Sequence, residues 1–243
     1  MSPTAPTPGL YAGWLSLALG AAVLLIVGLR SRRFPWHHFL AFIVPAVTAL
    51  SYTTLIFEQG VTVLSDGRVY DWARWLDACF GATLLLINTA LIALPPTRST
   101  PERGALLTGI ATASVLTMLT GLLAGASVDP APRWTWYLIG SGSYGAALWL
   151  LFVRVPDVAG RLGISEVRQS TYRRALYVIA SVPMLHPLWW LATPAGFDLV
   201  GRATQTWGFT LLDVLSKVAY PVYLLWGIYK IKPVAESAME STA

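Results

Sequence analysis

Charged residues are scarce in this chain. Asp, Glu, Lys and Arg together make up 12% of its 243 residues, about half of the ~25% that is usual in a soluble domain. Hydrophobic residues account for 55% of the sequence, and the mean hydropathy is +0.58. This composition argues against an ordinary soluble domain and favours a membrane protein.

Cysteine is almost absent. The one cysteine, Cys79, excludes an internal disulfide, and the redox compartment cannot be inferred from it. The sequence has no cluster of metal-ligating side chains, so we expect no metal site. The first residues carry no basic segment before the first apolar run, so we expect no cleavable signal peptide.

Long apolar runs, by contrast, fill most of the chain. A stretch of about 20 apolar residues crosses a bilayer as a helix, and continuous runs exclude barrel strands, whose residues would alternate. The expected spans cover about residues 9–30, 37–57, 71–95, 104–128, 133–154, 174–197 and 203–230. The sequence therefore predicts an all-α membrane protein in which residues 1–243 form a single seven-transmembrane-helix bundle. Segment 155–172 could extend its flanking helices beyond the membrane.

Basic residues are divided unevenly between the two ends of such a bundle. One side carries twelve of them: Arg30, Arg32, Arg33, Arg98, Arg103, Arg154, Arg161, Arg168, Arg173, Arg174, Lys230 and Lys232. The other side carries only Arg68, Arg133 and Arg202 outside the spans. The positive-inside rule therefore predicts that the N-terminus lies outside and the C-terminus lies in the cytoplasm. This asymmetry explains the net charge of +5 without a nucleic-acid partner.

Apart from charges at the ends of the expected spans, four charged residues lie further inside them. Asp213 and Lys217 are four residues apart and form the one charged pair within residues 203–229. A charge at the bilayer centre costs at least ~2.5–3.5 kcal/mol. Arg74 and Asp77, three residues apart, share one face of the third span. If these two faces meet, one lysine confronts two aspartates beside an arginine, and the charges balance.

This cluster has two interpretations. It could be a structural ion-pair network that holds the third and seventh helices together. Alternatively, Lys217 could be used chemically, because a lysine in a dry pocket becomes nucleophilic and can form a Schiff base with a carbonyl compound. A protonated Schiff base needs a counterion, which Asp77 and Asp213 would supply.

Five short motifs follow one another along nearly the whole chain. They are FIVPAVTALSY at 42–52, WARWLD at 72–77, RWTWY at 133–137, HPLWW at 186–190 and LLDVLSKVAY at 211–220. Together with the seven spans and the central lysine, this order resembles the microbial (type 1) rhodopsins, the bacteriorhodopsin-like family. The resemblance implies a photoactive protein of the lipid bilayer, in a prokaryotic plasma membrane, rather than an enzyme.

The resemblance also assigns roles to the charged cluster. It implies all-trans retinal bound as a Schiff base to Lys217, with Asp77 as the proton acceptor and Asp213 as the second counterion. Arg74 would tune both carboxylates, and Tyr52 would hydrogen-bond around Asp213.

Other residues are placed around the chromophore by the same resemblance. They are Trp190, Pro187, Tyr137, Ala78, Gly81, Gly121, Ser141 and Pro183. Ala78 and Pro183 stand where the family has two tryptophans, so Trp75, Met184 or Trp189 would have to refill the space. Gly81 replaces a threonine that usually hydrogen-bonds the acceptor aspartate.

Departures from the family pattern also occur along the proton path. Asn88 stands where proton pumps commonly place a carboxylate that returns the proton. Gln205 replaces a glutamate of the release group, and Asp198, in the loop between the sixth and seventh spans, is the one candidate to replace its function.

Three histidines need separate interpretations. His186 replaces a tyrosine beside Asp213, and it could either share a proton with that carboxylate near neutral pH or merely supply a hydrogen bond. His37 and His38 are expected at the surface.

Three functions remain open, and the first of them, light sensing, is preferred, with the other two as alternatives. A slow-cycling light sensor, signalling to a cytoplasmic partner through the long basic connection between spans five and six, is favoured by Asn88 and by the altered pocket. A light-driven outward proton pump is favoured by Asp77, Asp213 and Arg74 together. A non-photoactive scaffold is the third. The family also suggests a homo-oligomer.

Overall fold

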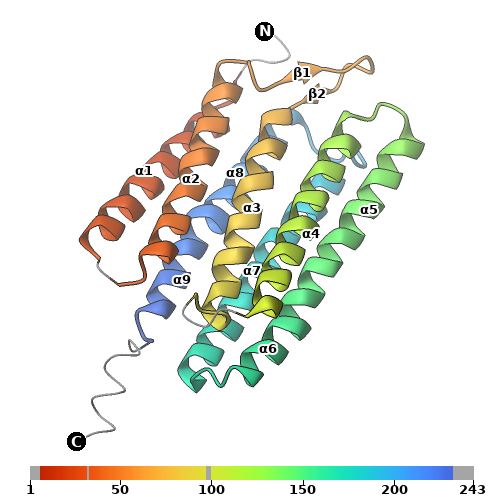
Figure 1. Cartoon of the computed structure of the whole chain (residues 1–243). Coiled ribbons are helices and arrows are strands. Elements are labelled where there is room, and N and C mark those ends of the chain that lie inside the picture. The colour runs from red at the N-terminus through yellow and green to blue at the C-terminus, as the bar shows by residue number, and fades with distance from the viewer. Residues whose placement is uncertain (1–5, 32, 97–99, 232–243) are drawn as a thin grey trace, which may run out of the picture.

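Seven helical spans packed as a bundle make up the computed structural model, which describes residues 6–31, 33–96 and 100–231 (Figure 1). Five spans are single helices: α1 (Pro8–Arg30), α2 (Pro35–Ile56), α3 (Trp72–Ala93), α4 (Pro101–Ala126) and α7 (Glu166–Ala192). The other two are α5 (Pro130–Trp149), continued through the π-helical turn η1 (Leu150–Arg154) into α6 (Val155–Arg161), and α8 (Arg202–Val214), continued through η2 (Leu215–Ala219) into α9 (Tyr220–Ile228). The predicted fold class is confirmed.

The spans differ from the prediction mainly around the connection between the fifth and sixth. The fifth continues to Arg161 and the sixth begins at Glu166, so only residues 162–165 join them. The expectation of a long loop at this connection is therefore wrong, whereas the expectation that the flanking helices extend into it is confirmed. Ser165 fixes the start of α7, because its hydroxyl accepts a hydrogen bond from the backbone N–H of Arg168.

A small hairpin that was not predicted lies between α2 and α3. Its strands β1 (Thr62–Val63) and β2 (Val69–Tyr70) are antiparallel. The hydroxyl of Tyr70 donates to the carbonyl of Leu122 at 2.6 Å, and Arg68 donates to the carbonyl of Ser127 at 2.7 Å. These bonds fasten the hairpin to the end of α4. We call this end of the bundle the hairpin end.

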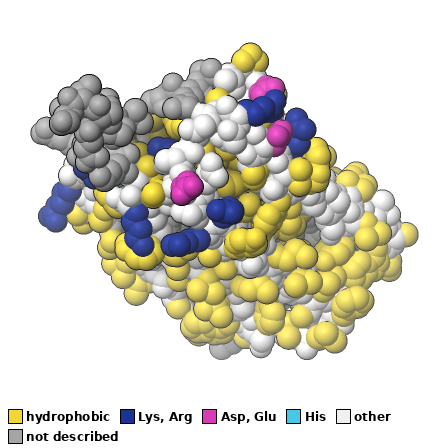
Figure 2. All heavy atoms as spheres, turned by 90° about the horizontal axis from the view of Figure 1, so that it is seen from below, with side chains coloured by type: hydrophobic (Ala, Val, Ile, Leu, Met, Phe, Trp, Pro, Cys, Tyr) yellow, Lys and Arg dark blue, Asp and Glu magenta, His cyan; other side chains and the backbone are white. Residues whose placement is uncertain are grey.

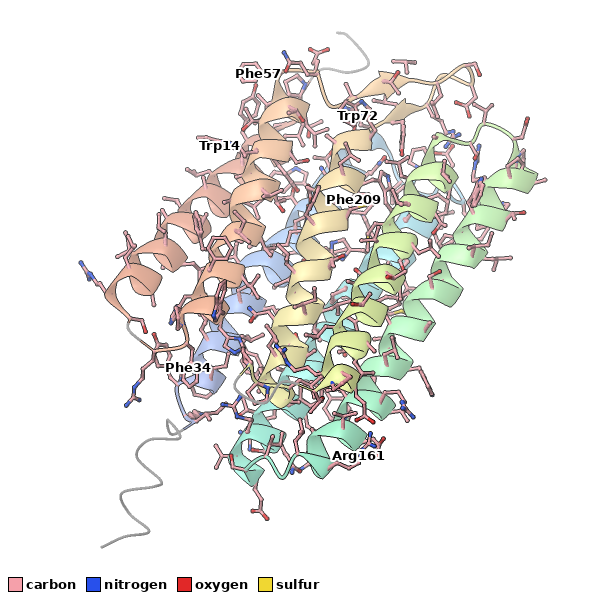
Figure 3. All side chains as sticks on the ribbon, viewed as in Figure 1. Trp14, Phe34, Phe57, Trp72, Arg161 and Phe209 are labelled. Carbon is pink, nitrogen blue, oxygen red and sulfur yellow. The ribbon has the colours of Figure 1, made fainter. Side chains whose placement is uncertain are left out.

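The opposite end is the one at which α1 finishes, α7 begins and α9 finishes, and we call it the basic end. Figure 2 views it from below and shows Lys and Arg side chains gathered over it. Arg161 of α6 lies there (Figure 3). Of the basic residues counted in the sequence, Arg32, Arg98 and Lys232 lie outside the described residues.

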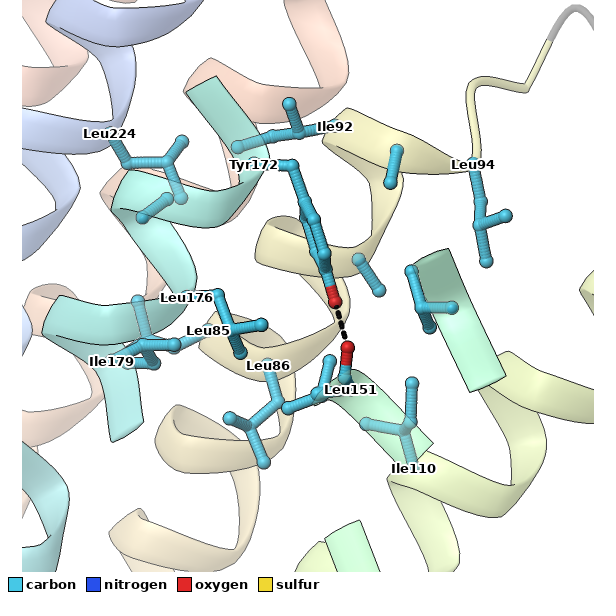
Figure 4. Packing of buried hydrophobic residues seen from close by; sticks show 14 of the residues in the cluster. Leu85, Leu86, Ile92, Leu94, Ile110, Leu151, Tyr172, Leu176, Ile179 and Leu224 are labelled. Carbon is cyan, nitrogen blue, oxygen red and sulfur yellow. Dashed lines mark hydrogen bonds between the residues drawn. The ribbon is translucent and has the colours of Figure 1, made fainter. Parts of the chain in front are cut away.

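The largest buried apolar cluster closes the bundle towards the basic end. It includes Leu85 and Ile92 of α3, Leu151 of η1, and Tyr172 and Ile179 of α7 (Figure 4). The Tyr172 hydroxyl donates to the Leu151 carbonyl at 2.5 Å. The π-helical turn η1 interrupts the regular α-helical ladder here. Tyr172 is therefore buried with its hydroxyl satisfied by a backbone carbonyl at this turn.

Large apolar side chains also cover the outside of the bundle. Trp14 and Phe57 point outward from α1 and from the end of α2, whereas Phe209 of α8 points inward (Figure 3). Leucine, tryptophan and phenylalanine side chains are exposed along every span. A protein with this surface would aggregate in water, but the surface matches a lipid environment.

Candidate functional site: a lysine between two aspartates

Lys217 lies in the middle of the seventh span, on the π-helical turn η2. It is buried, and its Nζ lies 2.6 Å from Oδ1 of Asp77 and 2.9 Å from Oδ1 of Asp213. Asp77 comes from α3, so the structure brings the charged faces of the third and seventh spans together. Two positive and two negative side chains, counting Arg74, offset one another in the interior.

Asp213 is the more fully bonded of the two carboxylates. Its Oδ2 accepts hydrogen bonds from the Tyr52 hydroxyl at 2.8 Å and from Arg74 at 2.9 Å. Arg74 also donates to the Tyr52 hydroxyl at 2.8 Å, and Thr210 lies 3.2 Å from that hydroxyl. Nε2 of His186 lies 3.4 Å from the other carboxylate oxygen. Asp213 therefore holds its charge with donors from α2, α3 and α7.

Asp77 has fewer partners. Besides Lys217, the hydroxyl of Thr48 of α2 lies 3.4 Å from Oδ1 of Asp77, and the same hydroxyl lies 3.1 Å from the carbonyl of Val44. Oδ2 of Asp77 is buried and has no hydrogen-bond partner among the described residues. Thr48 thus supplies a hydroxyl near Asp77, where the family's threonine at the position of Gly81 would supply one. Sequence analysis missed Thr48, although it lies one helical turn before Tyr52 and therefore on the same face of α2.

A largely apolar cavity of about 230 Å³ opens beside Lys217. Its lining includes eight of the residues predicted to surround a chromophore: Lys217, Trp190, Pro187, Tyr137, Ala78, Gly121, Ser141 and Pro183. Tyr52 belongs to the Asp213 network instead. Gly81 lies close by, since a Cβ added there would lie 3.9 Å from Cε of Lys217.

The tryptophans that the sequence lacks at positions 78 and 183 are partly replaced. Trp75 lines the cavity and packs on Gly121, where an added Cβ would lie 2.2 Å from its ring. Trp189 does not refill the cavity, because its indole packs on Gly208, where an added Cβ would lie 2.1 Å away. Trp190 is buried and stacks on Tyr137 with ring centroids 5.1 Å apart.

The cavity also reaches the hairpin end, past Arg74 to Asp71 and Gln205. Asp71 is buried and lies 3.4 Å from a guanidinium nitrogen of Arg202. The loop residue Asp198 is exposed, so the expectation that it replaces the missing glutamate is not supported by its position, and Asp71 is the carboxylate on this path.

Two histidines are not where the sequence suggested. His37 and His38 are both buried, contrary to the expectation that they lie at the surface. Nδ1 of His37 lies 2.5 Å from Oδ1 of Asn88. Nε2 of His38 instead lies 2.8 Å from the hydroxyl of Tyr229. Both histidines lie within the first turn of an expected span, where an interfacial position is expected, so the sequence alone does not predict their burial.

Comparisons with known proteins agree with this architecture. A family model described as bacteriorhodopsin-like protein matches residues 7–231. Archaerhodopsin-2 from Halobacterium sp. (strain aus-2) is 28% identical over 202 residues, which cover 82% of this chain and 74% of that protein. Cruxrhodopsin-1 from Haloarcula argentinensis is 26% identical over 238 residues, which cover 90% of this chain and 91% of that protein.

Solved structures have the same fold. The crystal structure of thermophilic rhodopsin from Rubrobacter xylanophilus has a TM-score of 0.83 and 26% identity, and the match covers 90% of this chain and 94% of that one. The light-driven proton pump Coccomyxa subellipsoidea rhodopsin has a TM-score of 0.80 at 20% identity, covering 91% and 97% of the two chains, and so supports the fold alone. The chain belongs to the bacteriorhodopsin-like family, and it is an integral membrane, light-driven protein that binds retinal through a lysine Schiff base.

Proposed function

We propose that this protein is a light-driven pump that carries protons from the basic end of the bundle to the hairpin end, by way of Lys217 and Asp77. The observation that carries this proposal is a one-sided geometry. Asp77 lies 2.6 Å from Lys217, and the cavity beside them continues towards the hairpin end, whereas an apolar cluster closes the bundle towards the basic end.

The residues around Lys217 fit retinal. The cavity is largely apolar, its lysine amine is buried, and only Lys217 of the three lysines in the sequence lies inside a span. Buried polar atoms of Arg74, Asp77 and His186 have no hydrogen-bond partner among the described residues, and they mark positions for ordered water near the amine. Retinal, when bound in the all-trans form, supplies a light-driven isomerisation that changes the geometry around Nζ.

The proton on Nζ of Lys217 would then pass to Asp77 rather than to Asp213. Hydrogen bonds to a carboxylate favour its charged form. Asp213 receives them from Tyr52 and Arg74, whereas one oxygen of Asp77 has no partner among the described residues. Asp77 is therefore the carboxylate more ready to take the proton.

Arg74 would link this step to proton exit. It is the cation next to Asp213, and it lines the cavity together with Asp71. Two of its guanidinium nitrogens, Nε and Nη2, are buried without partners among the described residues, so they would be available to donate to Asp71 once the side chain turns and Nη1 leaves Tyr52 and Asp213. Once Asp77 is neutral, Arg74 has less negative charge to hold it inward, and Asp71 with Arg202 is the next charged pair on the path.

The direction of transport follows from the charge distribution. The basic residues gather at one end, which the positive-inside rule assigns to the cytoplasm. Release at the hairpin end would therefore acidify the medium.

Light sensing is the second candidate, and Asn88 favours it. An amide cannot donate a proton at ordinary pH, so the return of the proton would be slow, as suits a signalling state. A cytoplasmic signalling partner is predicted only if the protein is a light sensor. The homo-oligomer is predicted from the family resemblance, and both stay predictions.

One experiment separates the two candidates. Cells that express the protein and are supplied with all-trans retinal should acidify their medium on illumination, and a protonophore should abolish the change. Lys217→Ala should give no pigment and no pH change. A visible pigment that moves no protons would overturn the pump and leave the sensor.

A further inference from the structure

His37 and Asn88 form a buried polar pair inside the apolar half of the bundle. His37 is 5% exposed and Asn88 is fully buried. The amide of Asn88 contacts His37 twice, through Oδ1 at 2.5 Å from Nδ1 and through Nδ2 at 3.4 Å from the backbone carbonyl. The second contact fixes which end of the amide faces the ring, and Oδ1 can only accept, so Nδ1 of His37 carries a hydrogen.

This pair lies between the basic end and Lys217. His37 is two residues from the start of α2, and Asn88 is eleven residues beyond Asp77, which is about 16 Å along a helix. A second buried polar contact lies at about the level of Asn88, where the hydroxyls of Thr89 and Tyr220 are 2.5 Å apart. Thr89 is the next residue of α3 after Asn88, and Tyr220 follows Lys217 by three residues on the seventh span. Tyr220 is therefore a polar side chain that joins this level of the bundle to the segment that carries Lys217.

Among the described residues, Arg168 and His38 are the charged or titratable groups that act on His37. Arg168 of α7 donates to the carbonyl of Ile92 at 2.9 Å and supplies a fixed positive charge nearby. His38, on the same helix, bonds to Tyr229 of α9. On α3, the partner of the ring is the uncharged Asn88. Asn88, and not a carboxylate, occupies the position of the expected proton donor. The imidazole of His37 contacts Asn88.

We propose that His37, held by Asn88, is the proton relay through which Lys217 is reprotonated from the basic end. Water at that end gives a proton to Nε2 of His37, and Nδ1 releases its own proton to a water chain towards Lys217, so the ring gains one proton and loses one. The hydrogen is then on Nε2, and a flip of the imidazole, which exchanges the two ring nitrogens, restores the bond to Asn88. Asn88 is a positioning residue, and its bond to Nδ1 must open for each transfer. The inference rests on the proposed function, because it requires that a proton first leaves Nζ.

The test is flash spectroscopy of the retinal-loaded protein with His37→Ala. We expect the recovery of the visible band to slow by roughly 10²-fold, the lower range for a lost general acid or base. Recovery should also become slower with each rise in pH, and added imidazole should restore it. His38→Ala is the matched control and should leave recovery within about twofold of the unmodified protein.

Equal recovery in His37→Ala and in the unmodified protein, or equal slowing in His38→Ala, would overturn the relay. If the flash instead releases no proton from the unmodified protein at all, the proposed function fails with it. A readout without retinal adds a second check. In the retinal-free protein labelled with ¹⁵N-histidine, Asn88→Ala should shift the Nδ1–H signal of one histidine, and an unchanged spectrum would contradict the assigned bond.

Discussion

Nζ of Lys217 lies 2.6 Å from Oδ1 of Asp77 although 140 residues separate them in the sequence. The contact joins α3 to the π-helical turn η2, and it places a carboxylate directly at the amine that we propose carries the chromophore. In the proposed function, the position of this negative charge would govern both the colour of the pigment and the first proton transfer.

Asp77→Asn should shift the visible band to longer wavelength and reduce light-driven proton release by at least 10²-fold. The negative charge of Asp77 stabilises the protonated Schiff base in the dark state. Its loss therefore reduces the energy difference between the ground state and the excited state of the chromophore. Absorption spectra and pH recordings of cell suspensions measure both effects. Asp66→Asn, at the hairpin, is a control that should change neither, and an unshifted spectrum in Asp77→Asn would remove Asp77 from this role.

Gly121→Ala should disturb the cavity. The new Cβ would lie 2.2 Å from the Trp75 ring, which would have to move. Overpacking of this kind costs about 1–3 kcal/mol, so we expect a lower melting temperature and weaker retinal uptake. Gly142→Ala is the matched control, because nothing lies within 4 Å of its added Cβ. Equal losses in the two variants would show that helix composition, and not the Trp75 contact, is responsible.

His186→Phe should change how the colour depends on pH. Nε2 of His186 lies 3.4 Å from Asp213, and its Nδ1 is buried without a partner among the described residues. Replacing the imidazole removes the nitrogen that faces Asp213, the carboxylate proposed as the second counterion. Spectra recorded across the acidic and neutral range in both proteins test this, and superimposable titration curves would leave His186 as a packing residue.

The hairpin should loosen in acid because of Asp66. Burial tends to raise the pKa of this carboxyl, but hydrogen bonds and charge from Arg68 outweigh it and hold the pKa below its ordinary value. A carboxyl with a depressed pKa stabilises the fold above its unfolded pKa, about 3.9, and this contribution disappears as the pH falls through the folded pKa.

Melting temperatures measured from pH 7 down to about 2 check this prediction. Asp66→Asn should melt lower than the unmodified protein at neutral pH, and the two curves should converge in acid. A constant difference between the two proteins at every pH would contradict an electrostatic role for Asp66.

The sequence was sufficient to predict the seven spans and the residues that meet at Lys217, because continuous apolar runs and charges at helical spacing are local signals. It was not sufficient for contacts that depend on packing between helices. Thr48 reaches Asp77 from α2, and Trp75 fits against Gly121 on α4, and neither sequence spacing nor composition encodes which helices are neighbours.

The burial of His37 was missed for a related reason. A histidine at the start of a span reads as an interfacial residue, and only the register of α2 against α3 places it on Asn88. The direction in which the termini face the membrane stays a prediction from loop charge.

Time-resolved infrared spectroscopy tests the central claim most directly. Light should produce the C=O stretching band of a protonated carboxylic acid while the proton is away from Lys217. This band should be absent in Asp77→Asn and present in the Asp66→Asn control. A carboxylic acid band that forms unchanged in Asp77→Asn would mean that another group accepts the proton, and the account of this site would be wrong.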